Sequence, residues 1–434
     1  MTRKSRLVCV FAVLACFLVL PLCSASPNPQ VVGSEIQVNV NNDSQVHNPA
    51  VAFDAFGRSM VVWENDLLGV RGRLYDASGA PLGNELALVA NAAWSALPGT
   101  APVTFHRDPA IAFLPSGDFV LAWAEEKGSL EWTIFFENLQ VQSREIVVQR
   151  FNELGQPTAR AFTLSSGGAG LKSRPRLAAR PAGDVAAAWM SGVGAAGTPA
   201  SEIGVFTRLV ANTGRPVGSQ TQVDTIAGST GFMPALAAEA DGSYLVAWES
   251  QKGADNFNVS IAGRVFDASG AAIAAPFAIT SGTTGPQRRP TVATNRQGAY
   301  LVAWQSYFND IWHARIDGQI VGKAGGLLGK RQVISSGAGS NYSEIAPSAV
   351  SAPGNNFVLV WMEYNTWFPV GMASIQVDHT AVPTGSQVWV NTQQIGSQAR
   401  TALGTDGAGH FMAPYEGFFN QTTVGIMANF IADH

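Results

Sequence analysis

The sequence predicts an all-β fold, a seven-bladed β-propeller built from four-stranded antiparallel blades. Three observations lead to this prediction. A motif that runs from Pro to Trp over a constant separation of 14 residues occurs six times, and a second hairpin pattern follows each copy. No stretch of the chain has a sustained helical periodicity. Regular four-strand units at a fixed period are typical of propeller blades.

Each copy of the motif consists of two short apolar runs around a turn, which predicts a β-hairpin. The six complete copies are Pro49–Trp63, Pro109–Trp123, Pro175–Trp189, Pro234–Trp248, Pro290–Trp304 and Pro347–Trp361. A seventh, degraded copy is expected from Arg400 to Pro414. Because Trp stands at one fixed point of each copy, we expect it to pack between neighbouring blades. We expect the proline to open the innermost strand, where a missing N–H costs nothing.

The two ends of the chain determine the blade count. The seventh unit stops after the strand pattern of 424–434 and lacks a fourth strand, whereas residues 34–41 resemble the fourth strands of other units. An N-terminal strand that completes the last blade removes the open sheet edges. An open β-solenoid and two separate sandwiches are the alternative architectures. Residues 34–434 are expected to form one domain, with blade cores near 49–90, 109–165, 175–225, 234–280, 290–335, 347–392 and 400–434 plus 34–41.

Residues 1–25 have the pattern of a secretory signal peptide, with a basic head, an apolar run and small residues before an expected cleavage after Ala25. All three cysteines lie in this segment: Cys9, Cys16 and Cys23. The mature chain would therefore contain no thiol. Leu22 stands where a bacterial lipobox has a small residue, so we do not expect lipoprotein anchoring at Cys23. The sequence predicts a secreted protein, periplasmic or extracellular, without a membrane span.

Charge and motifs limit the function. Removal of the leader would leave 24 basic and 31 acidic residues, a mild acidity that argues against a nucleic-acid binder. No metalloprotease, nucleophile-elbow, P-loop or calcium-loop motif occurs, so no catalytic residue, metal or cofactor is predicted. Propeller glycosidases use carboxylates alone, but no spacing singles out a pair. The carboxylates from which a pair could be drawn are Glu64, Asp108, Glu125 and Glu249.

The connections after the second strand of each blade vary in length, whereas the hairpin turns hardly change. Such variation on a rigid scaffold predicts binding loops on one face. These connections are rich in aromatic and acidic residues, which suit sugar rings and also suit protein partners. The aromatics could equally pack the loops onto the propeller. The predicted ligand-binding residues are Trp132, Phe135, Phe136, Tyr307, Trp312, Tyr364, Trp367 and Tyr415. The insert 128–144 is the best candidate for docking a partner.

Basic residues stand next to the repeat prolines, where they should line the mouth of the central channel. The predicted anion-binding residues are His47, Arg107, Arg174, Arg288 and Arg289, with Arg176 nearby. Arginines in a funnel can hold a carboxylate or phosphate through paired hydrogen bonds. The alternative is that these arginines form ion pairs with Asp108 and the glutamates of the loops.

Two segments carry a family resemblance. The sequences GSYLVAWES at 242–250 and GRVFDASG at 263–270 resemble the repeats of secreted bacterial seven-bladed propeller proteins, many of them surface or adhesive proteins. The resemblance implies an exported bacterial propeller and transfers no catalytic residue. Sialidases are also propellers with an arginine cluster. Their Asp-box places Trp three residues after Gly, whereas Gly57 and Trp63 are six apart.

These observations favour a non-catalytic extracellular binding module, lectin-like or protein-docking, whose partner is a glycan or protein at the cell surface. One alternative is a hydrolase or lyase that acts on acidic sugars at the arginine-lined channel mouth. Another is a structural subunit of a surface assembly. The oligomeric state cannot be inferred from the sequence.

Overall fold

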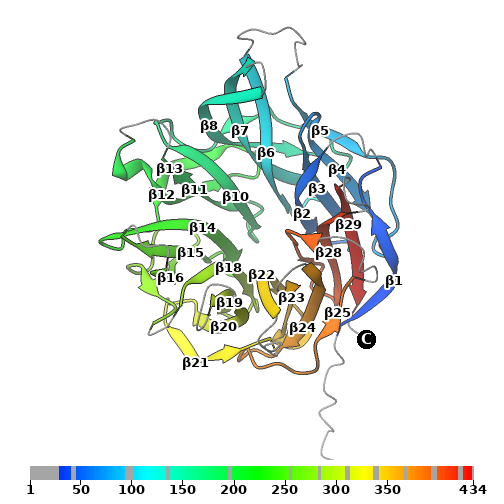
Figure 1. Cartoon of the computed structure of the whole chain (residues 1–434), viewed down its shortest axis with the longest axis vertical. Coiled ribbons are helices and arrows are strands. Elements are labelled where there is room, and N and C mark those ends of the chain that lie inside the picture. Colours follow the sequence, from blue (N-terminus) through cyan, green and yellow to red (C-terminus); the bar gives the residue numbers. More distant parts are fainter. Residues whose placement is uncertain are drawn as a thin grey trace, which may run out of the picture.

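Seven antiparallel sheets are arranged as a ring in the computed structural model of the chain (Figure 1). The structure describes residues 29–40, 45–92, 102–132, 137–193, 198–253, 257–281, 285–307, 313–335, 342–365, 369–391, 398–418 and 424–432. The predicted seven-bladed propeller of four-stranded blades is confirmed. The predicted signal peptide, with its cysteines, lies outside the described residues.

Consecutive strands form each blade, from the centre of the ring outwards. Blade one contains β2 (Val46–Phe53), β3 (Ser59–Asn65), β4 (Gly69–Tyr75) and β5 (Leu86–Ala90). Blade two contains β6 (Pro102–Phe113), β7 (Phe119–Trp132), β8 (Glu137–Phe151) and β9 (Phe162–Thr163). Blade three contains β10 (Leu171–Ala179), β11 (Val185–Gly192), β12 (Gly204–Val210) and β13 (Pro216–Gln222).

The next three blades repeat this order. Blade four contains β14 (Ser229–Ala238), β15 (Tyr244–Lys252), β16 (Val259–Phe266) and β17 (Phe277–Ala278). Blade five contains β18 (Gln287–Thr294), β19 (Ala299–Tyr307), β20 (Ala314–Gly322) and β21 (Leu327–Val333). Blade six contains β22 (Tyr342–Ser351), β23 (Phe357–Asn365), β24 (Pro369–Val377) and β25 (Val388–Trp389). Two short 3-10 turns lie between strands: η1 (Ala200–Glu202) between β11 and β12, and η2 (Pro353–Asn355) between β22 and β23.

The last blade closes the ring with strands from both ends of the chain. Its innermost strand is split into β26 (Gln398–Ala399) and β27 (Gly404–Thr405), followed by β28 (His410–Phe418) and β29 (Val424–Ala432). The outermost strand is β1 (Gln30–Gln37), which pairs antiparallel with β29. Closure by the N-terminal strand is therefore as predicted, although the strand begins four residues before the expected 34–41. No helix in the described ranges is long and apolar enough to cross a membrane.

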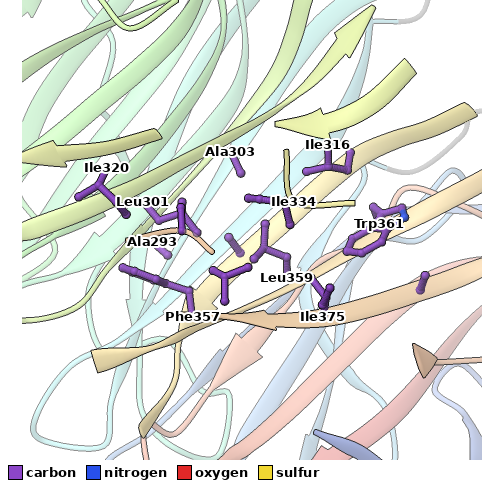
Figure 2. Packing of buried hydrophobic residues seen from close by; sticks show 14 residues of the cluster. Ala293, Leu301, Ala303, Ile316, Ile320, Ile334, Phe357, Leu359, Trp361 and Ile375 are labelled. Carbon is purple, nitrogen blue, oxygen red and sulfur yellow. The ribbon is translucent and has the colours of Figure 1, made fainter. Parts of the chain in front are cut away.

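The hydrophobic core is divided into seven clusters, each between two adjacent blades. Figure 2 shows the cluster between blades five and six, where Leu301 from β19 and Trp361 from β23 point into the same layer. The six repeat tryptophans are at most 2% exposed, and each belongs to the cluster that joins its blade to the preceding one. The expectation that Trp packs between blades is confirmed.

The seventh repeat is shifted by one residue from the expected alignment. The pairing of β27 with β28 has the same register as the pairing of β2 with β3. This register places Thr401 at the position of Pro49 and Tyr415 at the position of Trp63. Tyr415 is 1% exposed and belongs to the cluster between blades six and seven. The expected alignment of 400–414 was wrong because this copy has neither marker residue.

Candidate functional site

The innermost strands share an irregular backbone at the residue before the repeat proline. In blades one to six the strand pairing shifts there, as between His47 and Ala50 in β2. The residue before the proline, or before Thr401 in blade seven, has a positive φ in every blade. These residues are Asn48 (52°), Asp108 (52°), Arg174 (55°), Met233 (51°), Arg289 (51°), Ala346 (53°) and Arg400 (45°). All seven residues line a central cavity. The bulge therefore presents one side chain from each blade to the channel.

Three of these residues are arginines in a conformation that arginine rarely adopts. Positive φ is tolerated by Gly, Asn and Asp, so Asn48 and Asp108 fit their backbone. Arg174, Arg289 and Arg400 do not, and a left-handed residue with a long side chain costs about 1–2 kcal/mol. Residues that break a local preference without a structural gain are concentrated at functional sites. The three arginines therefore mark the channel mouth as the candidate site.

The cavity has a volume of about 320 Å³ and is lined by residues next to the repeat proline, or its equivalent, in all seven blades. Its charged lining residues are Asp108, Arg174, Arg176, Arg289 and Arg400. The lining therefore carries three net positive charges, whereas the whole chain has a formal net charge of −4. A concave positive surface in an acidic protein attracts an anionic ligand.

Arg176 lies one layer below the mouth, at a position that is small in the other six blades. The equivalent residues, by strand register, are Ala50, Ala110, Ala235, Thr291, Ser348 and Ala402. The Arg176 Nη1 donates a hydrogen bond to the carbonyl of Pro175 over 3.0 Å. The side chain keeps exposed surface, and that surface faces the cavity. Enclosure by the channel walls and repulsion from Arg174 lower the pKa of Arg176.

Arg289 is in the same electrostatic environment. The surrounding walls desolvate its guanidinium and lower its pKa, and the charges of Arg174 and Arg400 lower it further. Glu249 opposes this effect. Among the described residues, no carboxylate lies within ion-pair distance of the side chains of Arg174, Arg176 or Arg289. The cavity therefore holds several mutually repelling cations that a bound anion would neutralise.

The structure divides the five predicted anion-binding residues into two groups. Arg174 and Arg289 line the cavity, whereas His47, Arg107 and Arg288 do not. The latter three precede the positive-φ residue by one position and contact carboxylates instead. Their closest contacts are His47 Nε2 to Asp66 at 3.7 Å, Arg107 Nη1 to Glu64 at 2.7 Å and Arg288 Nη1 to Glu249 at 3.3 Å. These three residues make the contacts with carboxylates that the alternative prediction described.

Sequence reasoning missed Arg400 as a channel residue. Its guanidinium donates a hydrogen bond to Asn48 Oδ1 over 2.6 Å and lies 3.7 Å from Glu416. The signal was present, because Arg400 precedes the Thr401 that stands at the proline position. The misaligned seventh repeat placed Arg400 at the proline position itself and so hid its equivalence to Arg174.

The predicted aromatic residues are only partly within the described structure. Phe135, Phe136, Trp312 and Trp367 lie outside it, and Trp132 is described only as the last residue of β7. Tyr307 is half-buried at the end of β19, where Gln305 Nε2 donates to its hydroxyl over 2.6 Å. Tyr364 is 36% exposed. Tyr415 is buried at the blade-Trp position, so its placement on the loop face was wrong.

Among the described residues, exposed apolar side chains occur on both faces of the ring. On the side of the channel mouth, Leu67 is 52% exposed and Phe257 is 60% exposed. On the side of the hairpin turns, Phe56 is 71% exposed and Leu154 is 62% exposed. Single exposed apolar residues are normal on a protein surface.

The insert in blade two extends the sheet. Strands β7 and β8 pair from the ring to Trp132 and Glu137, with a register shift between Lys127 and Gly128, and β6 runs beside them from Pro102. Figure 1 shows this extension projecting beyond the outline of the ring. The described residues of 128–144 do not line the cavity. Within the described structure, the insert is an edge extension and leaves the channel mouth uncovered.

The carboxylates considered for acid–base chemistry are largely engaged in structure. Oε2 of Glu64 accepts a hydrogen bond from the backbone N–H of Asp108 over 3.0 Å. Glu249 makes the same contact to Arg289 in the next blade, over 2.7 Å. The nearby side chains of His106 and Lys127 hold the pKa of Glu125 at about 2. These carboxylates are inter-blade acceptors or ionised pairs, and no metal-binding group of three side chains occurs among the described residues.

Comparison with known proteins gives similarity in structure alone. No family model and no curated protein matches the sequence. A protein of unknown function from Dyadobacter fermentans is 10% identical, with a TM-score of 0.56 over 76% of this chain and 95% of its own. An ulvan lyase of polysaccharide lyase family PL25, bound to -[GlcA(1-4)Rha3S]-, is 9% identical, with a TM-score of 0.55 over 92% and 96%. At these identities the similarity establishes the propeller fold.

Proposed function

We propose that this protein is a secreted binding module that holds an acidic glycan at the mouth of its central channel. The observation that carries the proposal is the cavity of about 320 Å³ in which four arginines face one aspartate. Binding pockets of this size hold one or two sugar units. Guanidinium groups form paired hydrogen bonds with carboxylates and sulfates, and no other lining residue offers such a charge.

The walls of the cavity also suit a sugar. The repeat prolines and Met233 provide apolar surface between the arginines. Sugar rings present C–H faces that pack against apolar groups, while their charged substituents bind guanidinium. The same fold in the ulvan lyase is described with an oligosaccharide that contains glucuronate and a sulfated rhamnose. This precedent supports an acidic sugar as the ligand class.

A binding role is favoured over glycoside hydrolysis. Hydrolysis of a glycosidic bond commonly needs two carboxyl groups on either side of the bond. Asp108 is the one carboxylate in the described lining, and its Oδ2 accepts a hydrogen bond from the backbone N–H of Arg174 over 3.2 Å. A lyase that acts on uronates remains the second candidate. It is favoured by the arginines alone, which could neutralise a uronate carboxylate.

Binding to a panel of polysaccharides tests the proposal. Polygalacturonate, alginate and hyaluronan should bind, and neutral dextran should not. The double variant Arg174→Gln/Arg289→Gln should lose at least tenfold in affinity. Arg296→Gln is the matched control, because Arg296 is an exposed arginine with positive φ in the same blade but on the hairpin-turn side.

Two results would contradict the proposal. One is equal affinity for dextran and the acidic polymers, and the other is unchanged binding by the double variant. Absorbance from unsaturated uronate products would favour the lyase over the binding module.

A further inference from the structure

The four channel arginines come from alternate blades. Arg174 and Arg176 both come from β10 in blade three. Arg289 and Arg400 come from blades five and seven. The positive-φ residue of blade four, between Arg174 and Arg289, is the uncharged Met233. Blade three is the one blade that contributes two arginines to the described lining of the cavity.

The charge of the cavity exceeds what one carboxylate can neutralise. Four arginines and one aspartate line it, so a single bound carboxylate would leave two net positive charges. The channel walls lower the pKa of Arg289, and the charges of Arg174 and Arg400 lower it further, so these charges act on one another across the cavity. A second anionic group would reduce this repulsion and form paired hydrogen bonds with a guanidinium group.

We infer that the cavity takes a saccharide with two anionic groups, a sulfate ester in addition to a uronate carboxylate, and that Arg174 and Arg176 bind the second group. This inference rests on the proposed function and specifies its ligand. Arg176 carries five N–H donors, of which one is used on Pro175. Arg176 lines the cavity, where the small residues at the equivalent positions of the other blades leave room for a tetrahedral anion.

The arginines at the mouth of the cavity and those one layer deeper would bind different groups of the ligand. A carboxylate at the mouth can reach Arg289, and a sulfate one layer deeper can reach Arg176. Met233 belongs to the blade between them and would contact the C–H face of a sugar ring of the bound saccharide. Asp108 is the one negative lining residue, and it would repel either anion.

The test uses two ligands with the same backbone: hexasaccharides of unsulfated chondroitin and of chondroitin 4-sulfate, titrated calorimetrically at one ionic strength. The sulfated form should bind at least tenfold more tightly to the wild-type protein. Arg176→Gln should reduce that difference to twofold or less, because it should weaken binding of the sulfated form far more than binding of the unsulfated form. Asp108→Asn should raise affinity for the sulfated form several-fold, because Asn keeps the positive φ and the hydrogen-bond acceptor.

The outcomes separate this inference from the proposed function. Equal affinities for the two hexasaccharides, both lost in Arg174→Gln/Arg289→Gln, would overturn the sulfate site and leave acidic-glycan binding standing. A sulfation difference that persists in Arg176→Gln would also overturn it. No binding of either hexasaccharide or of any acidic polymer would overturn both proposals. As a control for correct folding, each variant should have the same midpoint temperature of thermal unfolding as the wild-type protein.

Discussion

The carboxylate of Glu249 in blade four accepts a hydrogen bond from the backbone N–H of Arg289 in blade five, over 2.7 Å. That N–H belongs to a positive-φ residue at a strand bulge, so it has no partner in the regular ladder. Similar contacts join other neighbouring blades, from Asp108 to Glu64 and from Ala346 to Gln305. The residue that follows the repeat Trp therefore links adjacent blades at the level of the channel mouth.

Replacement of this acceptor should destabilise the propeller. Glu249→Ala should lower the free energy of unfolding by about 2–3 kcal/mol, because it leaves a buried N–H without a partner. Glu249→Gln should cost less, since the amide of Gln305 accepts the equivalent bond in the next blade. Urea titration with an unchanged m-value measures both effects. Glu153→Ala, at a carboxylate that is 52% exposed, should change stability by less than about 0.5 kcal/mol.

The assignment of Tyr415 to the seventh blade core makes a second prediction. Tyr415→Ala should cost about 3–5 kcal/mol, as large aromatic truncations in a packed core do. Tyr364→Ala, at a side chain that is 36% exposed on the same side of the ring, should cost far less. Chemical denaturation of the two variants compares them directly. Equal and small effects would show that Tyr415 does not replace the blade tryptophan.

Most of the fold follows from local sequence patterns. The constant separation from Pro to Trp determines six hairpins, and the missing fourth strand at the C-terminus requires an N-terminal partner. Both features come from short-range chemistry, namely strand period, turn glycines and the need to pair sheet edges. The seventh repeat could be aligned only through strand register, because Thr401 and Tyr415 replace both marker residues.

The site was less predictable because it depends on backbone geometry. Two adjacent arginines, Arg288 and Arg289, have opposite environments because the bulge turns only the second toward the cavity. Neither composition nor spacing reveals a positive φ before a proline. The sequence shows that Glu249 follows the repeat Trp248. The contact of Glu249 with the next blade becomes evident only when the two blades are placed side by side.

The ion pair around Glu125 should make stability depend on pH in the acid range. His106 Nε2 lies 3.7 Å from Glu125 Oε2, and Lys127 Nζ lies 2.7 Å from Oε1. The contact with His106, followed by the Lys127 contact, lowers the pKa of Glu125 from 4.5 to about 2 against the effect of burial. The folded state favours the ionised form of Glu125, and these contacts therefore stabilise the fold. Their contribution to the free energy of unfolding is complete above pH 4.5 and is lost as the pH falls toward 2.

Comparison with Glu125→Gln measures that contribution. At neutral pH, the free energy of unfolding of the wild-type protein should exceed that of the variant by about 2 kcal/mol. Partial solvent exposure of Glu125 keeps this difference below the full effect of the pKa shift. The difference should shrink as the pH falls below 4.5. Urea midpoints for both proteins between pH 3 and 7 provide the measurement. A difference that is constant over this range would contradict the lowered pKa.

The positive-φ arginines should lower the stability of the fold and raise its affinity for acidic polysaccharide. Arg289→Asn places a residue that tolerates positive φ at a strained position, and it removes repulsion with Arg174 and Arg400. The variant should gain about 1 kcal/mol in the free energy of unfolding and lose at least tenfold in affinity for acidic polysaccharide. Ala346→Asn is the matched control, since it relieves the same backbone conformation in blade six without removing a charge. It should gain stability and keep its affinity. A loss of stability in Arg289→Asn would show that the arginine is held there by packing rather than for its ligand.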